Sequence, residues 1–313
     1  VVRRLQALLQ RAFFVESEAE KCGRKQQIVI DDASTDASAE IARAYAAKDN
    51  RIVLMHNELN SGAARTRNRA LDAARGKFIT FMDADDLCSP ERFAKQLAFF
   101  ERHPQTDICG SYYTMFGTRG GENDELKIQV PLTHEEIQYQ LFFGCPFGMS
   151  SVMLRSEPFK RTGIRFRECM AEDYQLWVDL SEHLRMANIP EYLTFYRRWE
   201  DQISTRQLDR QTLSAQLTQQ EQLARKLGVR LSDDEARIFT RFSLRTGEVK
   251  KRELASYRRI LTRLYKAGIR HSHDPKLLKR QLMRRYKMAC GLFYPSWRVW
   301  IHKRLFLVRL LAS

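Results

Sequence analysis

The stretch Phe78-Ile-Thr-Phe-Met-Asp-Ala-Asp-Asp86 is an apolar strand that runs directly into three carboxylates. A strand of this composition is normally buried, and burying an unpaired carboxylate is costly in free energy. Asp83, Asp85 and Asp86 therefore need a partner where the strand ends. A hard divalent cation that carries phosphate oxygens satisfies this need, because such cations prefer carboxylate and phosphate oxygen ligands.

A second strand, upstream of the first, also ends in acids. Gln27-Ile-Val-Ile30 is followed by Asp31-Asp32-Ala-Ser-Thr-Asp36. A helix is predicted to follow each acidic segment, so both acid clusters are expected at one edge of a parallel sheet. Open α/β sheets bind their ligands at that edge.

The first two-thirds of the chain alternate between strand and helix patterns, after a helical spacing of apolar residues in 1–14. This alternation predicts an α/β fold with a Rossmann-like, mainly parallel sheet and helices on both faces. The predicted strands are 28–30, 51–55, 77–82, 107–115, 149–155 and 191–196. The predicted helices are 37–47, 63–74, 90–102, 133–142 and 172–186.

The strand patterns stop near residue 205. The remaining segments have helical spacing and are separated by glycines and a proline. We therefore predict an α/β domain over residues 1–204 and an α-helical region over residues 205–313. The predicted helices of this region are 206–228, 233–246, 250–268, 274–290 and 296–311.

The charge of the chain is distributed unevenly. The net charge is +15, and residues 205–313 contain about 26 Lys and Arg against about 8 Asp and Glu, roughly +18. Residues 1–204 are left at roughly −3, which indicates two functions joined in one chain. The six cysteines form no C-x-x-C pair, which favours a reducing compartment over a disulfide framework or a zinc site. No apolar run reaches the roughly 18–20 residues that span a bilayer.

Several further motifs follow the two acidic segments in a fixed order. They are Asn60-Ser-Gly-Ala-Ala-Arg-Thr-Arg-Asn68, Ser151-Val-Met-Leu-Arg155, Ala171-Glu-Asp-Tyr-Gln-Leu-Trp177 and Tyr196-Arg-Arg-Trp-Glu-Asp-Gln-Ile-Ser204. Together with the acidic segments, this series resembles the family 2 glycosyltransferases over roughly residues 27–204. The resemblance implies the GT-A fold and, for most members, an inverting reaction.

The resemblance implies a nucleotide-sugar site at the first acidic segment. Asp32 matches the residue that contacts the uracil of a UDP-sugar, and Asp31 belongs to the same site. Arg67 matches the arginine that faces the nucleotide, with Arg65 as a competing choice, and Asp83 would approach the ribose. The alternatives are a helix-capping turn for Asp32 and a solvated helix arginine for Arg67.

The resemblance also implies a metal site at the second acidic segment. Asp85 would bind Mn²⁺ or Mg²⁺ that bridges the donor diphosphate, with Asp83 and Asp86 as further members of the metal site. The cation would neutralise charge on the departing diphosphate. The alternative is a solvated turn with an Asp that caps the helix beginning near Pro90.

Glu172 and Asp173 form the predicted catalytic pair. Inversion by a single displacement needs a general base that removes the proton of the acceptor hydroxyl, and the resemblance assigns this role to Asp173. The alternative is a pair of acids that complement the dipole at a helix N-terminus. Trp177, one turn further, is interpreted as a core residue.

The chain departs from the family pattern in two places. Family members usually begin with a strand of the type V-S-V-I-I-P-x-Y-N, and the helical pattern of 1–14 resembles the element after it, so we expect that the first strand is missing by truncation. Many relatives carry His after the Tyr-Arg motif, where this chain has Trp199. Phosphate contacts there would fall to Arg197 or Arg198, or be lost.

The basic helical region has three interpretations. It could present solvated faces of a small bundle, bind the anionic cytoplasmic leaflet through its terminal helix, or bind nucleic acid through clusters such as Arg284-Arg285. Nucleic acid is disfavoured because no recognition module is present. The membrane-binding face would combine Trp297, Trp300, Phe306 and Leu310 with Arg298, Lys303, Arg304 and Arg309.

The sequence thus predicts a metal-dependent inverting glycosyltransferase that moves a hexose from a nucleotide-diphosphate sugar, most readily a UDP-sugar, to a glycan or lipid-linked acceptor. Bacterial surface polysaccharide synthesis, in the cytoplasm at the inner face of the membrane, is the expected setting. The rival hypothesis is a non-catalytic module that binds a membrane or nucleic acid and uses a decayed transferase fold. The missing first strand and Trp199 motivate this rival.

Overall fold

The computed structural model describes residues 26–119, 122–123, 125–199, 202, 206–270 and 274–311. They form two compact units. The α/β unit comprises the described residues within Val1–Ile137 and Cys145–Leu208, and the helical unit those within Gln138–Gly144 and Asp209–Ser313. A short segment of the first two-thirds of the chain therefore belongs to the helical unit. The helix expected over 1–14 lies outside the described residues, and the domain division at residue 204 stays a prediction.

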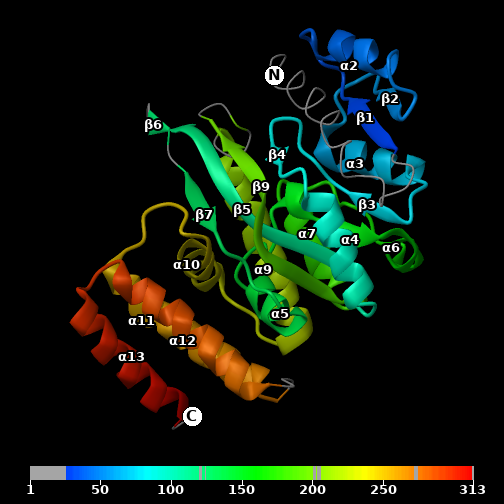
Figure 1. Cartoon of the computed structure of the whole chain (residues 1–313). Helices are drawn as coiled ribbons and strands as arrows, with labels where there is room; N and C mark the ends of the chain where they lie inside the picture. The colour runs from blue at the N-terminus through cyan, green and yellow to red at the C-terminus, as the bar shows by residue number, and fades with distance from the viewer. Residues whose placement is uncertain are drawn as a thin grey trace. The chain divides into compact units, whose positions relative to one another are not determined.

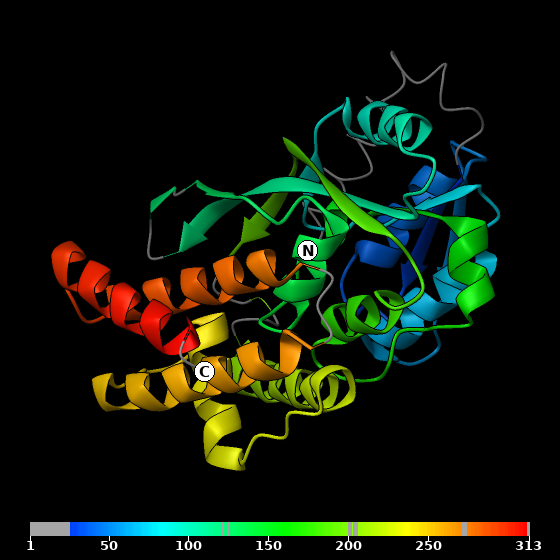
Figure 2. The ribbon, with the colours of Figure 1, turned by 90° about the horizontal axis from the view of Figure 1, so that it is seen from below.

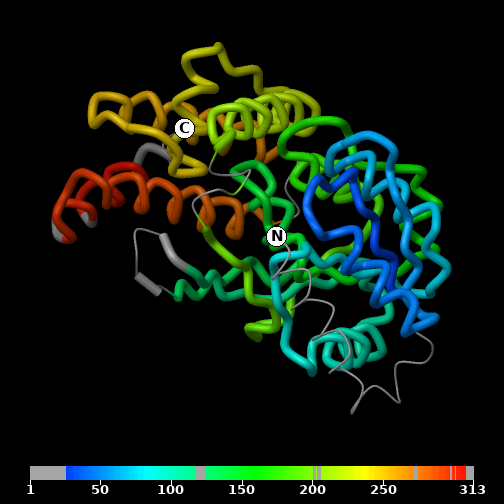
Figure 3. The backbone as a smooth tube through the Cα atoms, turned by 90° about the horizontal axis from the view of Figure 1, so that it is seen from above, coloured from blue at the N-terminus to red at the C-terminus, as the bar shows by residue number. Residues whose placement is uncertain are grey.

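The α/β unit begins with a small parallel sheet. β1 (Gln27–Asp31) and β2 (Ile52–His56) pair so that Asp31 lies opposite His56. The helices that follow the two strands are α2 (Ser38–Ala46) and α3 (Gly62–Ala73), drawn in blue and lighter blue in Figure 3. Ala42 of α2 is buried against residues of both strands, because its small side chain permits close packing of helix on sheet. This part confirms the predicted strand–helix alternation.

The second sheet of this unit has seven strands. Their order is β3 (Phe78–Thr80), β8 (Met153–Arg155), β5 (Ile108–Arg119), β9 (Met186–Arg198) and β4 (Leu87–Cys88), with β6 (Glu122–Asn123) and β7 (Leu126–Ile128) also paired to β5. The long strands β5 and β9 run parallel side by side (Figure 1). Every other pairing in this sheet is antiparallel.

The α/β fold class is confirmed, but the sheet is mixed rather than mainly parallel. Alternation of strands and helices predicts which segments are strands, but it does not determine which strands become neighbours. The chain inserts β8 between β3 and β5 in the antiparallel direction, and β4 pairs antiparallel with β9. The predicted strand over 149–155 begins as a 3₁₀ turn, Met149–Ser151.

In the described part of this unit, the sheet is accompanied by α4 (Arg92–Arg102), α6 (Ser156–Thr162) and α7 (Glu172–Leu180). α5 (His134–Leu141) begins in this unit, and its residues from Gln138 onward belong to the helical unit. α6 was not predicted from the sequence, and α7 ends six residues before the predicted end of its helix at 186. Residues Tyr174–Leu180 of α7 are buried. Trp177 is fully buried and packs edge-on against Phe147, with ring centroids 5.2 Å apart, which confirms that it is a core residue.

The helical unit is a bundle whose helices match the five predicted segments closely. They are α9 (Leu208–Leu227), α10 (Asp233–Leu244), α11 (Leu254–Gly268), α12 (Pro275–Gly291) and α13 (Ser296–Leu311). Ser232 caps α10 through a capping box with Glu235, and Asp274 caps α12. Helices α11, α12 and α13 pack against one another (Figure 2). Their apolar faces share one core with Phe142 and Phe143.

The structure corrects the predicted apolar face of α13. Phe306 has no exposed surface and packs on Tyr286 in the bundle core, so it is not available to a membrane. Among the described side chains of α13, Ile301 and Leu305 are the exposed large apolar ones, at 42% and 52%. The side chains of Trp297, Trp300, Arg309 and Leu310 lie outside the described part of the chain. None of the described helices is long and apolar enough to span a bilayer.

Candidate active site

The acidic loop (Asp83–Asp86) follows the end of β3 and is a hydrogen-bonded turn. The backbone N–H of Asp86 donates to the carbonyl oxygen of Asp83 at 3.1 Å. The backbone N–H of Asp83 donates to Ser150 Oγ at 2.9 Å. Asp86 is only 1% exposed, whereas Asp83 and Asp85 are half-buried. The turn therefore directs one carboxylate into the protein and leaves two nearer the surface.

The end of β9 holds the acidic loop from the other side. The backbone N–H of Arg197 donates to Asp86 Oδ1 at 2.9 Å, and its Nε donates to the carbonyl oxygen of Asp85 at 2.9 Å. Trp199 Nε1 donates to Asp85 Oδ2 at 3.2 Å. The segment that the sequence analysis singled out for its departure from the family pattern is thus bonded to the predicted metal ligand.

Asp86 is the most deeply buried carboxylate of the loop. Burial raises its pKa to about 7, and the nearby carboxylates of Asp83 and Asp85 act in the same direction. Among the described residues, its Oδ2 has no hydrogen-bond partner. Within the described part of the chain, the loop after β3 therefore contains a buried carboxylate with a hydrogen-bond partner for only one of its two oxygens.

Arg67 joins the acidic loop to α7. Its Nη2 donates to Asp83 Oδ1 at 2.9 Å, and its Nη1 donates to Glu172 Oε1 at 2.5 Å. Burial alone would lower the pKa of Arg67, but these two carboxylates raise it above its ordinary value. Arg65, the competing choice, instead pairs with Glu168, and both of those side chains are more than 60% exposed. Only Arg67 of the two lies among the predicted site residues.

Asp173 lies beside this cluster in the first turn of α7. Its Oδ1 accepts the backbone N–H of Tyr174 at 2.6 Å, and the Cys145 thiol lies 4.0 Å from its Oδ2. Burial and the Glu172 carboxylate raise the pKa of Asp173 to about 6. Glu172 is committed to the ion pair with Arg67. Of the two acids, Asp173 is therefore the one with the properties of a proton acceptor near neutral pH.

The acids at the end of β1 form a separate hydrogen-bonded group. Asp32 Oδ1 accepts from Asn57 Nδ2 at 2.7 Å and from the N–H of Ser61 at 2.8 Å, while Oδ2 accepts from the N–H of Gly62 at 2.9 Å. Partial burial would raise the pKa of Asp32, but these hydrogen bonds lower it below its ordinary value. Asp32 therefore binds the N-terminus of α3, a helix about 30 residues further along the chain, and a nucleotide contact by Asp32 stays a prediction.

Asp31 is buried and is paired with a histidine. Its Oδ2 lies 2.7 Å from His56 Nδ1, across the β1–β2 pairing. Its side chain is 5% exposed, whereas that of His56 is 53% exposed. His56 was not predicted as a site residue, because no sequence motif marks a residue that strand pairing brings opposite Asp31.

Asn57 is a second residue that the sequence analysis missed. It is buried at 8% exposure and donates to Asp32 and to Thr66 Oγ1, while its Oδ1 accepts from Arg69 Nη1. It therefore connects the end of β2 to the end of β1 and to α3.

The backbone at Ala33, next to Asp32, is strained. Ala33 adopts a left-handed conformation with φ of 56°, which costs a non-glycine residue roughly 1–2 kcal/mol.

Arg92 is a third such residue and lies beneath the acidic loop. It is fully buried, and its guanidinium donates to Thr80 Oγ1 at 2.6 Å, to Val152 O at 3.0 Å and to Gln96 Oε1 at 3.1 Å. Gln96 in turn donates to backbone carbonyls of β5 and of the 3₁₀ turn before β8. This network connects the last residue of β3 to α4 and β8, and it orients the chain that enters the loop.

The carboxylates of the acidic loop do not share one metal-binding arrangement. No group of three or more His, Cys, Asp or Glu among the described residues is placed to hold a metal ion. Asp83 is paired with Arg67, and Asp86 accepts from the backbone of Arg197. Asp85 remains suited to a cation that takes its other ligands from phosphates and water, which is how Mg²⁺ usually binds with a substrate.

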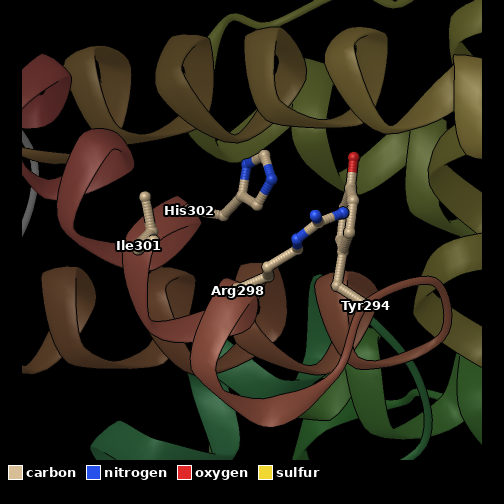
Figure 4. Close-up of a pocket in the computed structure, with 4 residues that line it drawn as sticks. All are labelled: Tyr294, Arg298, Ile301 and His302. Carbon is tan, nitrogen blue, oxygen red and sulfur yellow. The ribbon is translucent and has the colours of Figure 1, made fainter.

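A separate pocket lies in the helical unit and has a volume of about 280 Å³. Figure 4 shows its four lining residues, Tyr294, Arg298, Ile301 and His302, around α13. The rings of Tyr294 and His302 stack 4.4 Å apart. The lining contains no carboxylate, so this pocket has none of the groups that the acidic loop and α7 bring together.

Comparison with known proteins identifies the family of this chain. The model of the family described as "Glycosyl transferase family 2" matches residues 4–163. An uncharacterized glycosyltransferase of Methanocaldococcus jannaschii is 30% identical over 171 residues, which cover 54% of this chain and 59% of that protein. The Escherichia coli UDP-Glc:alpha-D-GlcNAc-diphosphoundecaprenol beta-1,3-glucosyltransferase WfaP is 32% identical over 189 residues, which cover 58% and 70%.

The same comparison extends to solved structures. The crystal structure of S. aureus TarS 1-349 in complex with UDP-GlcNAc has a TM-score of 0.57 and 20% identity, and the match covers 91% of this chain and 82% of that chain. This likeness confirms the predicted GT-A fold. The chain spans between 54% and 73% of the length of eight of the curated relatives that it matches. Its family match and its fold agree: the chain belongs to the family 2 glycosyltransferases.

Proposed function

We propose that this protein is an inverting glycosyltransferase that transfers a hexose from a UDP-sugar to a hydroxyl group of a glycan or lipid-linked acceptor. The observation that carries the proposal is the double ion pair of Arg67, which bonds Asp83 of the acidic loop and Glu172 of α7. Through this guanidinium, the segment with donor-binding chemistry and the helix with a proton acceptor meet in one cluster. Purely structural acids would not need to converge from two motifs about 90 residues apart on one arginine.

Asp173 is the proposed general base. A carboxylate with a pKa of about 6 is ionised at neutral pH and still basic enough to accept a proton as the acceptor oxygen attacks the anomeric carbon. Its neighbour Glu172 orients Arg67 instead of accepting the proton. The C1–O bond to the acceptor forms as the C1–O bond to the diphosphate breaks, and the hydroxyl proton passes to Asp173.

The proposed donor site lies at the acidic loop and the end of β1. Asp85 would hold Mn²⁺ or Mg²⁺ together with the donor diphosphate, and the cation would supply charge neutralisation for the leaving group. Asp83 and Arg67, which pair with each other, would contact the nucleoside. Asp31 and Asp32 would support the site from the end of β1, in the two-stranded sheet, through their hydrogen bonds to His56 and α3. The names of WfaP and of the TarS complex support a UDP-linked donor.

The proposed acceptor is a glycan under assembly on a lipid carrier, in bacterial surface polysaccharide synthesis. WfaP, whose name gives a diphosphoundecaprenol-linked acceptor, supports this choice. The helical unit could serve the same purpose by binding the anionic inner face of the membrane. Ile301 and Leu305 of α13 are exposed beside the exposed cations Arg298 and Arg304, a pattern typical of helices that lie at a membrane surface.

The membrane proposal has its own test. The protein should co-sediment with vesicles that contain anionic phospholipid at low salt and should be released as the salt concentration rises. Replacing Ile301 and Leu305 with Ser should weaken this binding, whereas Leu213→Ser and Leu217→Ser, exposed leucines of α9, should not. Equal binding of both double variants would contradict a role for α13.

The transfer proposal is tested by a donor screen that measures released UDP. With Mn²⁺ present, the protein should bind and slowly hydrolyse at least one UDP-sugar and should release UDP faster when the acceptor is present. Absence of both binding and hydrolysis for every UDP-sugar would contradict it. That outcome, combined with vesicle binding, would favour the rival hypothesis of a non-catalytic binding module.

A further inference from the structure

We propose that Trp199 is a positioning residue for Asp85, an inference that rests on the proposed function of the acidic loop. The indole N–H holds one carboxylate oxygen of Asp85 and leaves the other for a cation, which the donor diphosphate would also bind.

Three hydrogen bonds from the end of β9 and the residue after it support this role. Trp199 Nε1 lies 3.2 Å from Asp85 Oδ2. Two residues earlier, Arg197 binds the same loop twice, through its backbone N–H to Asp86 and through Nε to the carbonyl of Asp85. The Arg197 guanidinium also lies over the Phe116 ring at 4.6 Å, which anchors it to β5. The backbone and the side chain of Asp85 are therefore both held by the end of β9.

The chemistry of indole defines what Trp199 can do. Its Nε1–H is a donor only, so Trp199 cannot coordinate a cation, but it can occupy one oxygen of a carboxylate ligand. A carboxylate that is held in this way loses less conformational freedom when it binds a metal, and removal of such an orienting partner typically weakens metal affinity about 10–100-fold.

The surrounding carboxylates make this orientation important. Asp83 is paired with Arg67, and Asp86 points into the protein and accepts from Arg197. Within the described residues there is no ready-made set of three ligands. The cation should therefore bind through Asp85 and the donor phosphates together, and its affinity for the protein should depend strongly on UDP.

The experiment measures Mn²⁺ binding rather than turnover. Free Mn²⁺ is followed by electron paramagnetic resonance during titration of the full chain, with and without UDP. The wild-type protein should bind Mn²⁺ at least about 10-fold more tightly with UDP than without it. Trp199→Phe keeps an aromatic ring but removes the N–H, and it should weaken the UDP-dependent binding about 10–100-fold. Tyr192→Phe, which removes a hydroxyl from another ring of β9, is the matched control and should not change it.

Tryptophan fluorescence provides a second measurement on the same proteins. The addition of Mn²⁺ and UDP should change the emission of the wild type and of Asp173→Asn, because Trp199 contacts a group that changes its electrostatic surroundings. The change should be absent in Trp199→Phe. This readout distinguishes positioning from a general loss of stability, provided that Trp199→Phe retains the wild-type circular dichroism spectrum.

The outcomes separate this inference from the function on which it rests. If Asp85→Asn abolishes UDP-dependent Mn²⁺ binding while Trp199→Phe binds like wild type, the role of Trp199 is disproved and the donor site stands. If the wild type binds neither Mn²⁺ nor UDP, both are disproved. If Trp199→Phe fails to fold, an unchanged emission of the wild type on addition of Mn²⁺ and UDP would still overturn the inference, and a changed emission would support it.

Discussion

The ends of β1 and β3 both carry acidic side chains, but they satisfy these carboxylates in different ways. At β1, Asp32 accepts three hydrogen bonds from neutral donors of Asn57, Ser61 and Gly62. At β3, Asp83 is paired with the guanidinium of Arg67, and Asp86 keeps one carboxylate oxygen without a partner among the described residues. At the end of β1, neighbouring donors bind both carboxylate oxygens of Asp32. At the end of β3, one buried carboxylate oxygen has no donor among the described residues.

The pKa values follow this difference. Despite partial burial, hydrogen bonds lower the pKa of Asp32, whereas burial raises the pKa of Asp86 to about 7 and that of Asp173 to about 6. Buried carboxylates with raised pKa values are typical of functional sites, and fully hydrogen-bonded ones are typical of structural sites. Substitutions near β3 and α7 should therefore change activity, and substitutions near β1 should mainly change stability.

The largest expected effect is at the proposed base. Asp173→Asn should reduce the rate of transfer about 10²–10⁴-fold, because the amide cannot accept the acceptor proton. In the wild type, the rate should fall about tenfold per pH unit as the pH drops below about 6, since protonated Asp173 is inactive. Steady-state rates between pH 4.5 and 8 measure this dependence, and a flat profile would contradict the assignment.

Asp173→Asn should also raise the stability of the folded protein at neutral pH, although it lowers activity. The folded pKa of Asp173, about 6, lies above the unfolded value of 3.8, so its ionisation disfavours the folded state. The penalty is absent well below pH 4 and complete above about pH 6. Asp173→Asn should therefore be more stable than wild type by roughly 1–2 kcal/mol at pH 7.5 but not at pH 3.5. A variant that is less stable at pH 7.5 would favour a capping role.

The next largest effect is expected at the junction between the loop and α7. Arg67→Met should lower the free energy of unfolding by roughly 2–4 kcal/mol, because it leaves two partly buried carboxylates without their cation. Arg65→Met, which breaks an exposed pair two residues away, is the matched control and should have little effect. Urea denaturation measures both, and equal effects would contradict the special position of Arg67.

A smaller effect is expected at the end of β1. Asp32→Ala should lower the free energy of unfolding by roughly 1–2 kcal/mol, as the loss of a helix cap does. Asp36→Ala removes an exposed carboxylate that accepts from the N–H of Ser38 and should cost less. Thermal unfolding checks the order of the two variants. A reversed order would show that Asp32 does not hold α3.

The smallest expected effect concerns the backbone next to Asp32. Ala33→Gly should raise the free energy of unfolding by roughly 0.5–1 kcal/mol, because glycine adopts a φ of 56° without the strain that a Cβ atom causes. Ala46→Gly, in the right-handed last turn of α2, should instead lower it by roughly 0.5–1 kcal/mol. Urea denaturation compares the signs, and a loss of stability in Ala33→Gly would contradict strain at this turn.

The local elements could be predicted from the sequence because each depends on neighbouring residues. The helices of the basic region were predicted to within a few residues, since the glycines, Ser232 and Asp274 mark their ends. The antiparallel neighbours β8 and β4 could not be predicted, because pairing is decided by contacts between distant segments. The burial of Phe306 was missed because helical spacing does not say which of two apolar stripes faces the core.

The candidate site shows the same limit. Asp83, Arg67 and Glu172 were selected from their motifs, and the structure joins them directly. Asn57, His56 and Arg92 were missed, because their importance comes from partners far away in the chain. The bond from Trp199 to Asp85 spans 114 residues, so the sequence could mark the unusual residue but not its partner.

The central claim is that Asp85 serves donor binding and Asp173 serves proton transfer. Calorimetric titration of both variants, Asp85→Asn and Asp173→Asn, with UDP in the presence of Mn²⁺ tests this claim most directly. We expect Asp173→Asn to bind UDP with wild-type affinity although it no longer transfers sugar, and Asp85→Asn to lose most of that binding. Wild-type binding by Asp85→Asn, or loss of binding by Asp173→Asn alone, would contradict the account.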